Sequence, residues 1–143
     1  MKAEQVSIFL ENKAGRLAEV TRILFEARIN IRALAVADTS DFGVLRLIVS
    51  DTGKAEAVLK NQGFTVSRTE VAAVEVPDEP GGLYRILSII EENNINIEYM
   101  YTFAKQKGEN PIMIFRFEEI ASAVSILTEN GIRIISGEVL YRL

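Results

Sequence analysis

Residues 15–31 read GRLAEVTRILFEARINI, and residues 81–97 read GGLYRILSIIEENNINI, so one pattern occurs twice in the chain. Gly15 corresponds to Gly81, 66 positions later, and both copies end in Ile-Asn-Ile. Between these ends the apolar residues recur at the spacing of one helix face. Because an internal repeat decides the fold of a chain, this duplication predicts two similar modules.

The match continues beyond these residues after one change of offset. Later pairs lie 68 positions apart, as Leu59 and Leu127 do. Two extra residues in the second copy explain the change. The polar segment KQKGENP, at residues 105–111, is typical of a hairpin turn that can absorb them. We therefore expect one module at residues 1–69 and a second at residues 70–143.

Each module is predicted to run strand, helix, strand, strand, helix, strand. The alternation of Val6, Ile8 and Leu10 is typical of a strand. Each apolar side chain that the helices bury contributes about 1.5–3 kcal/mol. Later strands are expected at residues 33–37, 44–49, 64–67, 98–103, 112–117 and 132–135, and second helices at residues 54–61 and 118–130.

Glycine and asparagine mark the expected helix ends. Gly63 and Gly131 follow the second helices, as glycine commonly does. Asn30 and Asn96 follow the first helices, and asparagine tolerates the left-handed conformation that is common there.

Two helices on one face of a four-stranded antiparallel sheet form the ferredoxin-like α+β arrangement. Residues 68–71, between the modules, contain neither Pro nor Gly, which predicts two tightly packed modules rather than a flexible tether. The tail at residues 137–143 has strand character and is expected to add to a sheet edge.

Composition excludes several classes of function. The chain has 143 residues, a net charge of −4 and neither Cys nor His. It therefore lacks thiolate chemistry and the commonest metal ligand and general base, and we expect no cofactor. The negative charge argues against nucleic-acid binding. No apolar run approaches the roughly 20 residues that span a membrane, and the expected location is the cytoplasm.

The segments ENKAGRL, at residues 11–17, and PDEPGGL, at residues 77–83, each place a polar loop and a glycine before the leucine that opens a helix. With the duplication, they make the chain resemble the ACT domain family, and in layout the stand-alone tandem ACT proteins. The resemblance implies two ACT modules packed side by side into one eight-stranded antiparallel sheet, with the helices on one face. It also implies an amino-acid ligand, held where the first loop of one module meets the second strand of the other.

The resemblance carries over to two sets of residues. The first site would consist of Asn12, Lys13, Ala14, Gly15, Arg16 and Leu17, opposite Tyr99, Met100 and Tyr101. The second site would consist of Asp78, Glu79, Pro80, Gly81, Gly82 and Leu83, opposite Leu34, Ala35 and Val36.

Helix N-termini suit a ligand carboxylate because they present unpaired N–H groups and partial positive charge. In the first loop Lys13 and Arg16 would add to this attraction, whereas Asp78 and Glu79 in the second would oppose it. The hypothesis is therefore that the first site is the stronger one and the second is weak or absent.

Simpler interpretations remain open for the same residues. The two loop glycines, Gly15 and Gly81, can serve only to make a tight turn. Tyr99 and Tyr101 can fill a core or a subunit interface instead of touching a ligand. Lys13 and Arg16 can be ordinary solvated charges.

Three other functions compete with a non-catalytic amino-acid sensor. Enzymatic activity has no supporting constellation, since the chain lacks a Gly-x-Ser-x-Gly elbow and a phosphate loop. RNA binding has one faint indication, the aromatic pair Phe115 and Phe117 in an expected third strand. A regulatory subunit of a partner enzyme is the runner-up. Exposed sheet edges further predict a dimer or a higher homo-oligomer.

Overall fold

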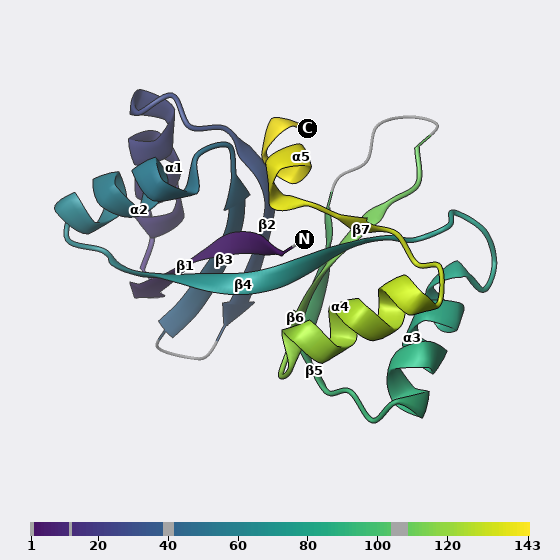
Figure 1. Cartoon of the computed structure of the whole chain (residues 1–143). Helices are drawn as coiled ribbons and strands as arrows, with labels where there is room; N and C mark the ends of the chain where they lie inside the picture. The colour runs from purple at the N-terminus through teal and green to yellow at the C-terminus, as the bar shows by residue number, and fades with distance from the viewer. Residues whose placement is uncertain (1, 12, 39–41, 104–108) are drawn as a thin grey trace. The chain divides into compact units, whose positions relative to one another are not determined.

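The computed structural model describes residues 2–11, 13–38, 42–103 and 109–143 (Figure 1). The chain divides into two compact units. The N-terminal unit comprises Glu4–Thr69 with Tyr141–Leu143, and the C-terminal unit comprises Glu70–Leu140 with Lys2 and Ala3. Asn12 and part of each predicted hairpin turn lie outside the described residues.

The N-terminal unit has the predicted order of elements. These are β1 (Ala3–Glu11), α1 (Arg16–Glu26), β2 (Ile31–Asp38), β3 (Phe42–Val49), α2 (Thr52–Asn61) and the first part of β4 (Thr65–Glu75). Its strands lie in the order β2-β3-β1-β4, and β3 is antiparallel to both β1 and β2. This is the ferredoxin-like order, so the predicted βαββαβ module is confirmed.

The C-terminal unit repeats this arrangement. It contains the rest of β4, α3 (Gly82–Glu92), β5 (Ile97–Phe103), β6 (Ile112–Phe117), α4 (Ile120–Glu129), β7 (Ile134–Ile135) and most of α5 (Gly137–Arg142). Its strand order is β5-β6-β4-β7, again with antiparallel neighbours. The fold is therefore α+β, built from two tandem modules.

The predicted number of strands is wrong, because β4 is continuous through the expected linker. The described ranges form seven strands rather than eight. Residues 68–71 lie inside β4, where Val71 is fully buried. The segment is rich in Thr and Val, which favour strands, and contains no residue that breaks one. Strand β4 is therefore both the last strand of the N-terminal module and the first strand of the C-terminal module.

Each unit buries its own apolar core between its helices and one face of its sheet. In the N-terminal unit α1 and α2 lie side by side against the face that carries Ile8 and Leu47 (Figure 1). In the C-terminal unit, Phe115 and Phe117 stack with ring centroids 5.3 Å apart and are fully buried. Because these rings lie in the core, they cannot stack on bases, and the indication of RNA binding was wrong.

The tail is a helix, not the predicted strand. The backbone N–H of Leu140 donates to the Ser136 carbonyl over 3.0 Å, and Leu140 is fully buried. The N–H of Val139 donates to Ser136 Oγ over 3.4 Å. Serine before a helix is a recognised start signal, and here it precedes Glu138 in the first turn. The six residues of α5 are too few to show a helical period.

Candidate ligand site

The first predicted loop ends in a glycine that the backbone requires. Gly15 precedes α1 with φ 86° and ψ −9°, a left-handed conformation that favours glycine. A Cβ atom built on Gly15 would meet no atom of the described residues within 4 Å. No described side chain caps the helix. The N–H of Arg16 donates to the Lys13 carbonyl over 3.3 Å, so only the remaining N–H groups of the first turn can serve a partner.

The second loop repeats this geometry with a tighter interior. Gly81 precedes α3 with φ 86° and ψ −5°, and again no side chain caps the helix. A side chain at Gly82 would collide with the carbonyl oxygen of Pro77. The loop therefore folds back under the start of α3, which brings its side chains beside the strands of its own unit.

The two cations of the first loop are already engaged. Lys13 Nζ lies 2.9 Å from a carboxylate oxygen of Glu11. Arg16 contacts Glu11 over 3.5 Å and Glu19 over 3.0 Å. These four side chains sum to zero charge, so the expected attraction of this loop for a ligand carboxylate is weaker than the sequence suggested.

Glu11 is the partner that sequence reasoning missed. The hydrogen bond from Lys13 and the positive charges of Lys13 and Arg16 hold the pKa of Glu11 below its usual value. The signal was present in the sequence, since Glu11 stands at the end of a strand just before both cations.

The second loop lines a cavity of about 470 Å³, here called the α3 cavity. Its lining residues are Val76, Pro77, Asp78, Glu79, Pro80, Leu83, Thr102, Pro111 and Met113. Four residues of the predicted second site therefore lie together. The other side of the cavity comes from β5 and β6 of the same unit, which the sequence analysis did not foresee.

Hydrogen bonds join the sides of the α3 cavity, and one of them runs from the N–H of Val76 to the Pro111 carbonyl over 2.9 Å. The N–H of Asp78 donates to Oδ1 of Asn110 over 3.1 Å, which ties the loop to the segment before β6. Thr102 Oγ1 donates to the sulfur of Met113 over 3.3 Å, which joins β5 to β6.

The residues predicted as opposite walls lie on the second strands of the units. Leu34 and Val36 share one face of β2 and are about half exposed, while Ala35 lies on its other face. On β5, Tyr99 and Tyr101 share a face, as predicted. Met100 lies on the other face and packs against the core of its own unit.

Other predicted residues are also accessible. Leu17 in the first turn of α1 is about half exposed, and Ala14 is exposed. Asn12 lies outside the described residues. No helix in the described ranges is long and apolar enough to cross a membrane. Within those same ranges, no cluster of three acidic side chains could hold a metal ion.

The family model for the ACT domain pair matches residues 1–143. The chain belongs to this family. The ACT domain pair is a regulatory module, so the resemblance read from the two loops and the repeat is confirmed. No curated protein matches the chain.

Solved structures resemble this ACT domain pair over nearly its full length. The protein BT0572 from Bacteroides thetaiotaomicron has a TM-score of 0.94 and 40% identity, covering 100% of this chain and 98% of that chain. The regulatory subunits of aspartate kinase from Thermus thermophilus and Thermus flavus have TM-scores of 0.61 and 0.59. Their identities are 14% and 15%, and each comparison covers 88% of this chain and 90% of that chain. The two Thermus subunits therefore share the fold alone.

Each module of this ACT domain pair thus carries a glycine-opened helix, but with different surroundings. The cations of the first loop are paired with Glu11 and Glu19, while the second loop lines the α3 cavity with two acidic side chains. The predicted pairing of each loop with the second strand of the other module stays a prediction.

Proposed function

We propose that this ACT domain pair is a non-catalytic sensor that binds a free amino acid in the α3 cavity. The observation that carries the proposal is a cavity of about 470 Å³ at the uncapped, glycine-opened start of a helix. This volume lies within the usual range of small-molecule sites.

The lining of the α3 cavity matches the three parts of an amino acid. The N–H of Gly82 already donates to the Glu79 carbonyl over 3.0 Å, and the remaining first-turn N–H groups of α3 suit the carboxylate. Asp78 and Glu79 suit the ammonium group, so the acidic pair that the sequence analysis counted against this loop becomes an argument for it. Leu83 and Met113 offer an apolar surface to the ligand side chain.

The residues of the first loop remain a second proposed contact region. Lys13, Gly15 and Arg16 stand at the other uncapped helix start. Tyr99 and Tyr101 are also retained as proposed ligand contacts. Because Glu11 and Glu19 neutralise the cations, we place this region second.

The family and the composition together support a regulatory rather than a catalytic role. The chain contains no His and no Cys, which are the usual general base and thiol nucleophile. A sensor of this kind acts by binding its ligand better in one conformation than in another.

A thermal-shift screen against the twenty free amino acids tests the proposal. A ligand at one hundred times its Kd should stabilise the protein by about 2.7 kcal/mol. The variant Glu79→Gln should lower the affinity for that ligand, because the substitution removes a negative charge that would face the ammonium group. Glu91→Gln, on an exposed position late in α3, is the matched control and should leave affinity unchanged. A screen in which no amino acid raises the melting temperature would refute the sensor.

A second candidate function is that of a subunit that modulates a partner enzyme of amino-acid metabolism. Leu34 is 54% exposed and Val36 is 44% exposed on β2, and neighbouring apolar side chains of this kind commonly mark interaction surfaces. The same surface could hold a second copy of the chain. Light scattering on Leu34→Ser and Val36→Ser, and a pull-down with and without amino acids, would separate self-association from partner binding.

A further inference from the structure

Helices α1 and α2 cover only one face of the N-terminal sheet. Ile8 and Leu10 of β1 lie on that face and belong to the buried core. Because successive side chains of a strand point to opposite faces, Phe9 and Glu11 lie on the other face. The register adds Phe42 of β3 to them, since Phe42 pairs with Glu11. We call this second face the outer face of the N-terminal sheet.

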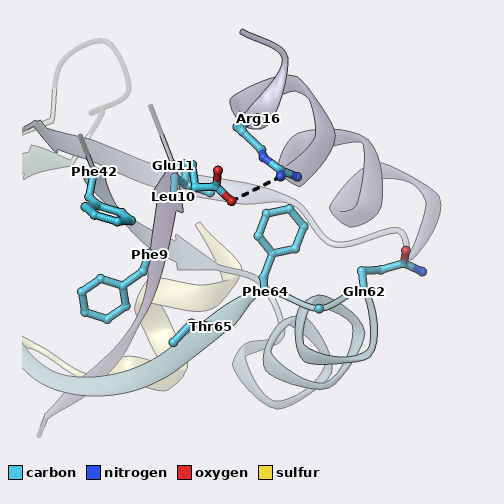
Figure 2. A pocket seen from close by; sticks show the side chains of 9 residues that line it. Phe9, Leu10, Glu11, Arg16, Phe42, Gln62, Phe64 and Thr65 are labelled. Atoms are coloured by element: carbon cyan, nitrogen blue, oxygen red, sulfur yellow. Dashed lines mark ion pairs between the residues drawn. The ribbon is translucent and has the colours of Figure 1, made fainter. Parts of the chain in front are cut away.

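Two phenylalanine rings stand exposed on the outer face. Phe9 is 51% exposed and Phe42 is 57% exposed. Phe9 pairs with Val44, and Phe42 pairs with Glu11, so the two phenylalanines are diagonal neighbours on adjacent strands. Figure 2 shows both rings on one side of β1, whereas Phe64, which packs against the core, lies on the other side. The two rings therefore form one apolar surface.

The apolar surface continues onto β2 and ends within the outer face. Ala37 is exposed and pairs with Val44, which is half-buried. Farther along β1, Ser7 lies on the same face but is only 7% exposed. The open surface, here called the phenylalanine patch, consists of Phe9, Phe42, Val44 and Ala37. Neighbouring exposed apolar side chains of this kind commonly mark an interaction surface.

The duplicated fold does not require these rings. At the repeat offset of 66, Phe9 corresponds to Glu75, and at the later offset of 68, Phe42 corresponds to Asn110. The register supports this match, because Glu75 pairs with Ile112 as Phe9 pairs with Val44. The C-terminal unit thus builds the same module with an acid and an amide at these positions. The two phenylalanines serve something other than the folding of a module.

The rim of the phenylalanine patch carries both signs of charge. The side chain of Glu11, opposite Phe42, is 49% exposed, and that of Lys13 is 65% exposed. With Arg16 and Glu19 this rim is neutral. A neutral rim gives little attraction to a strongly acidic or basic partner. It is complementary to itself, because under a two-fold axis each charge can meet the opposite charge of a second copy.

We infer that the phenylalanine patch is an interface between two copies of this chain, related by a two-fold axis. An axis that follows the line from Val44 to Glu11 lays Phe9 of each copy on Phe42 of the other. Both ring pairs can then make the offset or edge-to-face contacts that aromatic groups prefer. The same axis brings the two rims together, so that Lys13 of each copy can contact carboxylates of both. This dimer requires no amino acid and goes beyond the proposed function.

The size of the phenylalanine patch indicates a weak dimer. A fully covered aromatic side chain buries about 150–250 Å². Two half-exposed rings per copy therefore supply well under half of the roughly 800 Å² that each partner buries in a stable interface. We expect a dissociation constant in the micromolar range, and a dimer fraction that rises with protein concentration.

Sedimentation velocity on the full chain, without added amino acid, tests the interface over a series of protein concentrations. The double variant Phe9→Glu with Phe42→Asn carries the residues that the C-terminal unit has at the same positions, so it should fold, and circular dichroism checks this. It should weaken the dimer at least tenfold. Phe25→Glu is the matched control, because Phe25 is 78% exposed on α1, outside the patch, and its variant should dimerise like the wild type.

Two charge variants test whether the partner is a second copy. Lys13→Glu makes the rim more negative by two charges, and Glu11→Lys makes it more positive by two. Each variant alone should therefore self-associate at least tenfold more weakly than the wild type. Mixed in equal amounts, the two should form a heterodimer at least tenfold tighter than either homodimer, because their rims then have opposite charges.

The results of these experiments are decisive in both directions. A wild type that stays monomeric at every concentration would overturn the dimer, and so would a double phenylalanine variant that dimerises like the wild type. If Leu34→Ser with Val36→Ser abolishes the dimer instead, the second copy binds at the edge of β2 and not at the phenylalanine patch. The thermal-shift screen is independent of these outcomes. A dimer without any amino-acid ligand would refute only the sensor, and a monomer that binds an amino acid would refute only the interface.

Discussion

At the scale of single residues, backbone conformation explains both a success and an error of sequence reasoning. Gly15 and Gly81 were predicted at helix starts, and their positive φ explains why glycine stands there. Asn30 and Asn96 were predicted to adopt the left-handed backbone conformation where the chain leaves the first helix of each module. The structure instead has Arg28 at φ 59° and Asn94 at φ 54°. Residue type alone gave the wrong positions, because the left-handed residue is the one that directly follows the C-cap at the end of the helix.

The left-handed Arg28 leads to a prediction of stability. A left-handed residue with a Cβ costs roughly 1–2 kcal/mol, and glycine avoids this strain but loses more freedom on folding. Arg28→Gly should therefore raise the free energy of unfolding by about 0.5–1 kcal/mol in a urea titration. Asn94→Gly should raise the free energy of unfolding by less, since asparagine already tolerates the left-handed conformation. A loss of stability in Arg28→Gly would contradict the argument.

Two buried hydroxyl groups should respond oppositely to their removal. The hydroxyl of Thr52 is buried and has no hydrogen-bond partner within the described ranges. Valine has the shape of threonine but no hydroxyl group. The Thr52→Val variant should therefore be as stable as the wild type, or more stable by up to about 1 kcal/mol. Ser7 accepts a hydrogen bond from Gln5 over 2.9 Å, and Ser7→Ala should cost about 1 kcal/mol. Thermal unfolding of the two variants distinguishes them by sign.

The lowered pKa of Glu11 leads to a prediction about how stability depends on pH. Its pKa is lowered in the folded chain, so its contribution to stability is present above the unfolded value, near 4.5, and is lost as the pH falls through the folded value. NMR titration should find the midpoint of Glu11 below 4.5, and Lys13→Met should move it upward. Because the group is exposed, salt should reduce the difference. A midpoint unaffected by Lys13→Met would mean that the ion pair does not form in solution.

At the scale of elements, periodic stretches were predicted well and short or non-periodic ones were not. The helix stripes around Val20 and Ile86 form the two cores as expected. The continuity of β4 was missed because absence of Pro and Gly was read as a tight linker, although it equally permits a strand. Helix α5 was missed because its six residues give no period.

Tyr141 in the last turn of α5 allows a direct test of that helix. Its hydroxyl oxygen accepts a hydrogen bond from the N–H of Glu4 over 2.7 Å, and its carbonyl accepts one from Arg32 Nε over 3.0 Å. Tyr141→Phe removes only the first bond and should cost about 1 kcal/mol. Hydrogen exchange at the Glu4 amide should become faster. If the amide keeps its protection, the tail does not dock through this hydroxyl.

At the scale of the whole molecule, the duplication predicted two related sites but not their chemistry. Repeats indicated where the two loops lie, and glycine indicated that both helix starts are open. The sequence could not show that Glu11 neutralises the first loop, because ion pairs depend on side-chain placement. Nor could it show Thr102 and Met113 beside the second loop, since these contacts join residues distant in the chain.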